Sequence, residues 1–205
     1  MKIHIGIILK DNNVEMFNFI SSVLSHYPGS NIDITIFDNS KYSWNTNITE
    51  RLKYKDWIEN FNFFKNKNNF TAIEIHNKII QENEFDLYIK LDNSCIIKKD
   101  NWLLPIINCL DNSTGMIGYH PSFGLSTTGP TIKKHSKNDY KIIDTHKLLN
   151  VKDEIFRSSL FGIQKSTIKR VGQLGNSFFE YAERCSKNEY KNYYIVDFTY
   201  IDQKL

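Results

Sequence analysis

Three short clusters of acidic, amide and hydroxyl side chains each follow an apolar run of the kind that forms a buried strand. The clusters are Asp11–Asn12 after residues 3–9, Asp38–Asn39–Ser40 after residues 32–37, and Asp92–Asn93–Ser94 after residues 87–91. In an open α/β sheet, ligands bind beyond the carboxyl ends of the strands. Asp and Asn also form ordinary turns, so one cluster alone indicates little. The shared position of all three predicts a single crevice that gathers them.

The elements that would carry these clusters follow from the hydrophobic pattern. Residues 3–9 and 32–37 predict buried strands, and residues 14–27 repeat apolar side chains at helical spacing. Strand, helix and strand form a βαβ unit, which implies a parallel, doubly wound α/β sheet. Further strands are predicted at 87–91, 116–119, 158–163 and 193–201, and further helices at 70–81, near Pro105 and at 177–186. We expect residues 53–64 to be helical or irregular and residues 121–155 to form long loops.

Length and composition indicate one compact domain. The chain has 205 residues, 40% of them hydrophobic, and its formal net charge of +3 is too mild for a nucleic-acid binder with a strongly basic face. The three cysteines and six histidines show no disulfide or metal-ligand spacing. The first apolar run is too short for a signal or transmembrane segment, so we expect a cytoplasmic protein. The sequence contains neither a P-loop nor a GxGxxG turn.

Several segments, taken in order, resemble a known family. They are "IFDNS", "NNFTAIEIHNKIIQENEFDLYIKLDNS…NWL" and "LFGIQKSTIKRVGQLGNSFFEYAERC". The set is similar to the GT-A glycosyltransferases, especially the large inverting family-2 group, and it spans most of residues 3–198. The resemblance implies a single GT-A domain over residues 1–205, with a mostly parallel, Rossmann-like central sheet and flanking helices. Residues 1–94 would bind the nucleotide sugar, and residues 95–205 would form the acceptor side.

The resemblance also implies roles for individual residues. The predicted nucleotide-sugar contacts are Asp11, Asp38, Ser40, Asn69, Asn77, Asp92 and Asn93. A divalent cation, Mn²⁺ or Mg²⁺, would be held by Asp92 with Ser94 and Asp202. Glu183 would take the proton of the acceptor hydroxyl, with Glu180 and Arg184 as further candidate catalytic residues on the same helix. Attack on the anomeric carbon would then invert its configuration.

Two positions depart from the family pattern. Ser94 stands where the family has a metal-binding Asp, and a hydroxyl is a far weaker ligand for a hard cation than a carboxylate. Arg184 replaces the acid that most often serves as the base. One hypothesis joins both changes: Arg184 would face the leaving diphosphate in place of the metal. The alternative for this helix is a surface helix with Glu180–Arg184 and Glu183–Lys187 pairs.

Three functions are compatible with the residues. The leading one is a glycosyltransferase that moves a sugar from a nucleoside diphosphate sugar to a glycan, lipid-linked or protein acceptor. The second is a catalytically degenerate domain that binds nucleotide sugars or acts as a scaffold, which Ser94 and Arg184 favour. The third is a nucleotidyltransferase, which the lack of a basic, Gly-rich phosphate loop disfavours. A free-standing domain, one domain of a longer polypeptide and a unit that works with a partner all stay open.

Overall fold

The computed structural model describes residues 1–9, 13–40, 50–119, 140–143, 146–150, 159–196 and 199–203. These residues form a nine-stranded sheet, in the order β3-β2-β1-β4-β9-β6-β10-β8-β7, and a two-stranded sheet of β11 and β5. The strands are β1 (Ile3–Leu9), β2 (Ile32–Asp38), β3 (Ile58–Lys65), β4 (Leu87–Asp92), β5 (Cys95–Ile97), β6 (Thr114–Tyr119), β7 (Tyr140–Ile143), β8 (His146–Asn150), β9 (Leu160–Gln164), β10 (Lys191–Val196) and β11 (Ile201–Gln203). The helices are α1 (Asn13–Ser25), the 3-10 helix η1 (Glu50–Tyr54), α3 (Ala72–Glu82), α4 (Leu104–Asn108), α5 (Lys165–Val171) and α6 (Phe178–Lys187).

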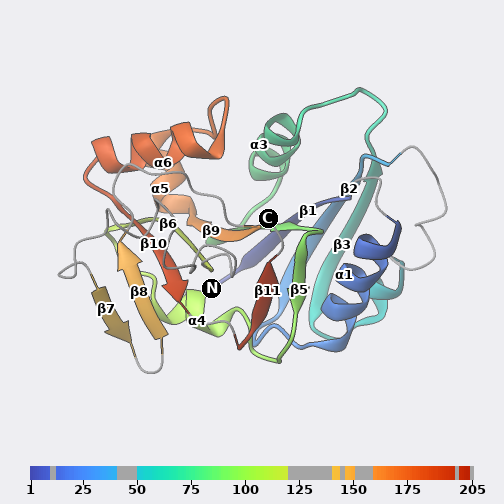
Figure 1. Cartoon of the computed structure of the whole chain (residues 1–205). Helices are drawn as coiled ribbons and strands as arrows, with labels where there is room; N and C mark the ends of the chain where they lie inside the picture. Colours follow the sequence, from blue (N-terminus) through green and yellow to red (C-terminus); the bar gives the residue numbers. More distant parts are fainter. Residues whose placement is uncertain are drawn as a thin grey trace.

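Most strands of the large sheet run in one direction. β3, β2, β1 and β4 are parallel neighbours, and β9 lies antiparallel between β4 and β6. β10 pairs parallel with β6, and β8 and β7 complete that edge with antiparallel pairs. The predicted α/β class, a mostly parallel central sheet with flanking helices in a single domain, is confirmed (Figure 1).

Helices cover both faces of the sheet, and the sheet separates the core into two clusters (Figure 1). On one face, Phe19 of α1 packs in the same cluster as Ile89 of β4. On the other face, Ile79 of α3 and Tyr181 of α6 share a cluster with Tyr88 of β4. Neighbouring residues of β4 therefore face opposite layers, as the two-residue period of a strand requires. None of the described helices is long and apolar enough to span a membrane.

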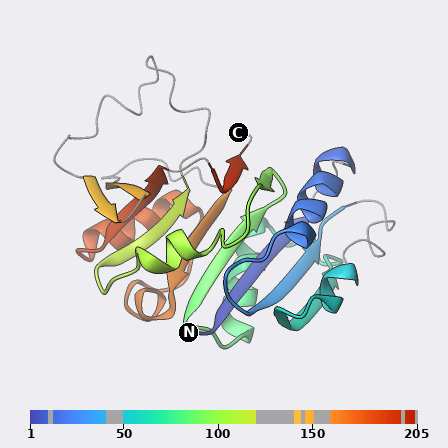
Figure 2. The same ribbon diagram turned by 90° about the horizontal axis from the view of Figure 1, so that it is seen from below.

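The parallel strands finish at one common end of the sheet. β1 begins near the N-terminus, and Figure 2 shows β5 and β11 at the far end, where β1, β2 and β4 stop. β5 follows β4 after a two-residue turn and pairs antiparallel with β11. This end is the one at which an open α/β sheet binds ligands.

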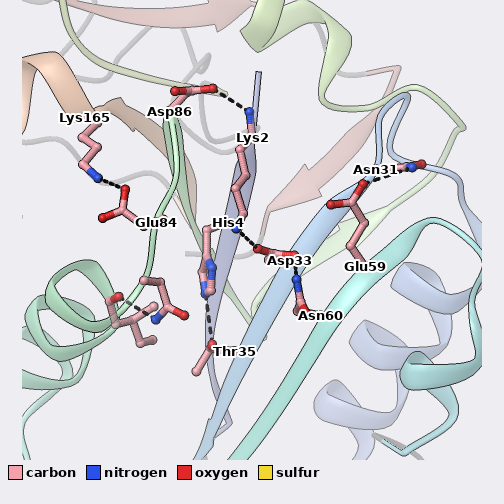
Figure 3. Close-up of polar contacts among 12 residues, drawn as sticks. Lys2, His4, Asn31, Asp33, Thr35, Glu59, Asn60, Glu84, Asp86 and Lys165 are labelled. Carbon is pink, nitrogen blue, oxygen red and sulfur yellow. Dashed lines mark hydrogen bonds and ion pairs between the residues drawn. The ribbon is translucent and has the colours of Figure 1, made fainter.

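The prediction for residues 53–64 is wrong over most of its length, because residues 58–65 form the edge strand β3. Ile58, Phe61 and Phe63 are partly buried against the core, while Asn60 donates a hydrogen bond of 2.8 Å to Asp33 Oδ1 on β2 (Figure 3). An edge strand of this kind buries only part of its side chains, so its apolar pattern is weaker than that of β1 or β4.

Other departures concern short elements. Within residues 121–155, predicted as loops, β7 and β8 form a hairpin at the sheet edge, and the rest of that segment lies outside the described residues. The single closing strand predicted at 193–201 is two strands, β10 and β11, in different sheets. Helix α5 follows β9 directly and was not predicted, because its seven residues are too short to show a helical period.

Candidate functional site

Asp38 and Asp92 end two strands that flank β1, at the edge where the parallel strands finish. Asp38 pairs in register with Leu9, and Asp92 pairs with Ile8. Because neighbouring strands lie about 4.8 Å apart, the Cα atoms of the two aspartates are about 10 Å apart across the end of β1. We call this edge the rim and define it by Asp38–Ser40, Lys65, Lys90 and Asp92–Ser94. The structure thus brings together two of the three predicted clusters, and Asp11–Asn12 lies outside the described residues.

The carboxylate of Asp38 is buried and holds the turn at the end of β2. Its Oδ1 accepts hydrogen bonds from the backbone N–H of Ser40 (2.9 Å) and from the Ser40 hydroxyl (2.5 Å). Its Oδ2 accepts a bond of 2.9 Å from the ammonium of Lys65, which also donates to the Ser40 carbonyl. Asp38 therefore orders Ser40 and Lys65, and the Lys65 side chain, 36% exposed, is the accessible member of the group.

Asn66 ties the end of β2 to the turn that precedes α3. Its Nδ2 donates to Asn39 Oδ1 (2.8 Å) and to the Phe70 carbonyl (2.9 Å), and its Oδ1 accepts from the Phe70 N–H (3.1 Å). Asn69 is exposed in the same turn with a φ of 53°, a left-handed conformation that Asn adopts more readily than most residues. The left-handed backbone of the turn is therefore sufficient reason for an asparagine at position 69. The predicted contact of Asn69 with a nucleotide sugar stays a prediction.

Asp92 is paired with a lysine that lies two residues earlier on the same face of β4. The ammonium of Lys90 contacts Asp92 Oδ2, and it lies 5.1 Å from the ring centroid of Phe178 and 5.3 Å from that of Phe161. The Lys90 side chain is 8% exposed, whereas that of Asp92 is 27% exposed. Among the described residues, Asp92 Oδ1 has no hydrogen-bond partner, so this oxygen is available to a ligand hydroxyl.

Tyr88 lies two residues before Lys90 on the same face of β4. Its hydroxyl lies 2.5 Å from His76 Nδ1 on α3, and a Cβ at Gly6 would lie only 2.0 Å from that hydroxyl. Burial, and secondarily the carboxylate of Asp92, raise the pKa of Tyr88 well above its usual range. The neutral phenol therefore occupies the space that glycine leaves on β1.

The turn after Asp92 borders a cavity of about 310 Å³. Its lining residues are Glu15, Asn18 and Ser21 of α1 with Asn93, Ser94 and Ile96. Pockets for small ligands begin at about this size. The Ser94 hydroxyl lies 2.6 Å from the Ser159 hydroxyl, and the Ser159 carbonyl accepts the N–H of Asp92 at 2.8 Å. Ser159 thus holds both ends of the turn that forms one wall of the cavity.

The rim residues approach the end of the sheet from both faces. Asp38 lies two residues after Ile36 and therefore on the same face of the sheet, which packs toward α1. Asp92 lies four residues after Tyr88 and therefore on the opposite face, which packs toward α3 and α6. The cavity lies on the α1 side. A ligand that contacts both aspartates must therefore lie across the end of β1.

Glu180 lies in the first turn of α6 and contacts the loop that precedes the helix. Its Oε2 accepts a hydrogen bond of 2.9 Å from the N–H of Asn176, and its own N–H donates to the Ser177 hydroxyl at 3.0 Å. Ser177 is the N-cap of α6. These contacts give Glu180 a structural role at the helix start.

Arg184 fastens α6 to the end of α5. Its guanidinium donates to the carbonyls of Val171 (3.1 Å) and Gln173, and it lies 5.2 Å from the ring centroid of Tyr181. The expected pair with Glu180 has an N–O distance of 3.9 Å, at the long end for an ion pair. A contact of Arg184 with a diphosphate would require these carbonyl bonds to break.

Glu183 differs from its neighbours on α6. It is half-buried, and among the described residues it makes no hydrogen bond or ion pair, including the expected pair with Lys187. A partly buried carboxylate without a partner can accept a proton from a ligand hydroxyl. Of the three predicted catalytic residues, Glu183 is therefore the one whose carboxylate is available.

Asn77 connects α3 to the loop before α6. Its Nδ2 donates a hydrogen bond of 2.8 Å to the Leu174 carbonyl, and its Oδ1 is buried without a hydrogen-bond partner. A buried amide oxygen of this kind can accept a donor from a ligand. The predicted nucleotide-sugar contact of Asn77 stays a prediction.

The described side chains do not form a divalent-cation site. Asp92 supplies one carboxylate, and its Oδ2 already contacts the ammonium of Lys90; the Ser94 hydroxyl is engaged with Ser159. Hard cations are bound by several oxygen ligands, preferably carboxylates. No group of three or more His, Cys, Asp or Glu residues able to hold a metal occurs in the described part of the chain. The strand β11 places the backbone of Asp202 opposite Ile96, and its side chain lies outside the described residues.

Sequence reasoning missed Lys65 and Lys90 of the rim, and it missed Asn66, which hydrogen-bonds to Asn39. Lys90 carried a signal, because it is the one charged residue in the apolar run 87–91. Lys65 and Asn66 carried none, because residues 53–64 were not predicted as a strand and their contacts with β2 are not local in sequence.

Comparison with solved structures identifies the fold. The mannosyltransferase PcManGT from Pyrobaculum calidifontis, in complex with GDP-Man and Mn²⁺, matches with a TM-score of 0.67 at 10% identity, over 96% of this chain and 55% of that one. TarS of S. aureus matches with a TM-score of 0.64 at 11% identity, over 100% of this chain and 37% of TarS. GalNAc-T7, solved with UDP, GalNAc and Mn²⁺, matches with a TM-score of 0.63 at 13% identity, over 95% and 42%. No protein-family model and no curated protein sequence matches the chain.

These matches show that the chain has the GT-A fold, as the ordered motifs predict. The chain spans about half or less of the length of each of these proteins. At such low identity the likeness establishes the fold alone, because one fold hosts many functions. The narrower resemblance to the family-2 group stays a prediction.

Proposed function

We propose that this chain is a glycosyltransferase domain that moves a sugar from a nucleoside diphosphate sugar to an acceptor hydroxyl, with inversion. The observation that carries the proposal is the placement of Asp38 and Asp92 at the ends of β2 and β4, on either side of β1. Proteins with this fold were solved with GDP-Man, with UDP and with UDP-GlcNAc. The three cysteines, Cys95, Cys109 and Cys185, are buried, which suits the reducing cytosol that we propose as the location of the protein.

The donor would lie across the end of β1. The Asp92 side chain is 27% exposed, and its Oδ1 is without a partner among the described residues. This oxygen would accept a hydrogen bond from a ribose hydroxyl. The nucleoside would occupy the side of the 310 Å³ cavity, near Asn93 and α1. The ammonium of Lys65, which pairs with Asp38, would face the donor.

The reaction would be a single displacement. The acceptor oxygen forms a bond to the anomeric carbon, while the bond between that carbon and the diphosphate oxygen breaks. Glu183 takes the proton of the acceptor hydroxyl, a contribution of roughly 10²–10⁴ in rate. The nucleoside diphosphate leaves with the bonding electron pair. The divalent cation implied by the resemblance is not part of this proposal, because the described donor set does not fit one.

The experiment is a screen of nucleoside diphosphates and their sugars by thermal shift, followed by measurement of free nucleoside diphosphate with each binding donor. A ligand that binds the native state raises the unfolding midpoint. Asp92→Asn should reduce the shift, whereas Asp86→Asn should not. Asp86 is a matched control, because it precedes the opposite end of β4, is exposed and accepts a hydrogen bond from the N–H of Lys2 (Figure 3). No shift with any donor would refute the proposal.

The second candidate is a binding or scaffold domain without turnover. The observation that favours it is the structural use of Glu180 and Arg184 in contacts between α6 and the preceding loop. This candidate requires donor binding without release of nucleoside diphosphate, including in the presence of candidate acceptors. The release measurement therefore separates the two functions.

A further inference from the structure

We propose that the ammonium of Lys90 supplies the positive charge that a divalent cation would otherwise supply at the rim, so that the chain binds its nucleoside diphosphate without a metal. The inference rests on the proposed function and specifies how the same site meets the charge of its donor. It differs from the sequence-based hypothesis, which assigned this task to Arg184.

The first support is the position of Lys90. Its ammonium contacts Asp92 Oδ2 at the end of β4, where the resemblance places the cation. The ring centroids of Phe161 and Phe178 lie 5.3 and 5.1 Å from the ammonium, within the range of cation–π attraction. Because the side chain is 8% exposed, water and salt screen its charge much less than that of a surface lysine.

The second support is the charge balance at the end of β4. Two carboxylates with one divalent cation have no net charge, and neither does one carboxylate with one ammonium. Ser94 in place of an acid removes one negative charge, and Lys90 adds one positive charge. Together these two residues keep the site neutral without a divalent cation. A divalent cation added to the Asp92–Lys90 pair would have to displace the ammonium from Oδ2. Removal of Lys90 would leave an uncompensated carboxylate beside the incoming diphosphate.

The third support is a repeat of the arrangement on β2. Asp38 is paired with Lys65 at 2.9 Å, on the strand beyond β1. Both described aspartates of the rim are thus paired with lysines, and the diphosphate would approach a surface whose own charges cancel. Arg184, by contrast, is occupied by the carbonyls of Val171 and Gln173.

The experiment is a titration of UDP and GDP in EDTA and in excess Mn²⁺, because neighbouring structures were solved with UDP and with GDP-Man. The test variant is Lys90→Met, because an unbranched apolar side chain can pack against the rings of Phe161 and Phe178. The control is Lys165→Met, whose lysine pairs with Glu84 near the other end of β4 (Figure 3). The ammonium of Lys165 lies 5.6 Å from the ring centroid of Phe85. Far-UV circular dichroism of each variant checks its fold.

The wild-type affinity should be equal in EDTA and Mn²⁺ within about twofold. Lys90→Met should weaken binding roughly 30-fold or more in EDTA, the usual effect of removing one partner of a buried charge pair. Lys165→Met should leave the affinity unchanged.

A second variant tests the idea without disturbing the aromatic contacts. Ser94→Asp places a second carboxylate two residues after Asp92 and should weaken binding of the nucleotide in EDTA. In Lys90→Met/Ser94→Asp, which has two carboxylates and no ammonium, binding should require Mn²⁺. A purely structural role of Lys90 would not create this dependence on the metal.

The possible results separate the inference from the proposed function. Wild-type binding that tightens tenfold or more with Mn²⁺, or unchanged affinity in a folded Lys90→Met, would overturn the inference and leave the proposed function standing. Failure of the wild type to bind either nucleotide in both conditions would overturn the proposed function, and the inference with it.

Discussion

His4 should make the stability of the fold fall as the pH drops below neutrality. The imidazole is 1% exposed on β1, its Nε2 lies 3.0 Å from the Thr35 hydroxyl, and its Nδ1 is buried without a hydrogen-bond partner. Burial lowers its pKa from 6.5 to about 4; the nearby Asp33 opposes this effect and Lys2 adds to it. Figure 3 shows His4 on β1, Asp33 and Thr35 on β2, and Lys2 directly before β1.

The direction of this change in stability follows from proton binding. Between the folded pKa and the unfolded value of 6.5, the unfolded chain binds a proton that the folded chain excludes, so stability is lost as the pH falls from 6.5 toward 4. From pH 7 to pH 5 this one group should cost roughly 2 kcal/mol of unfolding free energy. β1 pairs with β2 and β4, which carry Asp38 and Asp92 of the rim, so binding experiments belong near pH 7.5.

The assay is urea unfolding of the wild type and of His4→Gln at pH 7 and pH 5. Glutamine can keep a bond to the Thr35 hydroxyl but does not titrate, so the variant should lose about 2 kcal/mol less than the wild type over this interval. Equal losses in the wild type and His4→Gln would refute the assignment of this effect to His4.

Two further substitutions test α6. Glu183→Gln should lower turnover by roughly 10²–10⁴ while donor affinity stays within about twofold, because the carboxylate acts on the acceptor proton; steady-state rates and a binding titration check this, and an equal loss confined to Glu180→Gln would move the base to that residue. Arg184→Ala should lower the unfolding free energy by about 1.5–3 kcal/mol through the lost bonds to the Val171 and Gln173 carbonyls, without changing the affinity for UDP. A folded Arg184→Ala of unchanged stability with much weaker UDP binding would instead support a contact of Arg184 with the diphosphate.

The parts of the fold that follow from local patterns could be predicted from the sequence. β1, β2 and β4 are apolar runs buried on both faces, and α1, α3 and α6 have apolar faces, so their types were predicted and their bounds came within a few residues. Because parallel strands end at one edge, the placement of Asp38 and Asp92 followed from these strands.

The parts that depend on distant partners could not be predicted. β3 is an edge strand without a fully buried residue, and β5 pairs with β11 about a hundred residues later. Lys90 is held by Phe178, which comes from a helix on another part of the chain. Arg184 falls in the second turn of α6, where its reach to Val171 depends on the unpredicted helix α5.

The central claim is that a nucleoside diphosphate lies across the end of β1, between Asp38 and Asp92. A crystal structure of the chain with the nucleoside diphosphate that gives the largest thermal shift tests it most directly. Our account predicts a ribose hydroxyl on Asp92 Oδ1 and the diphosphate within a few ångströms of the Lys90 ammonium. A nucleotide bound away from the carboxyl ends of β2 and β4 would contradict it.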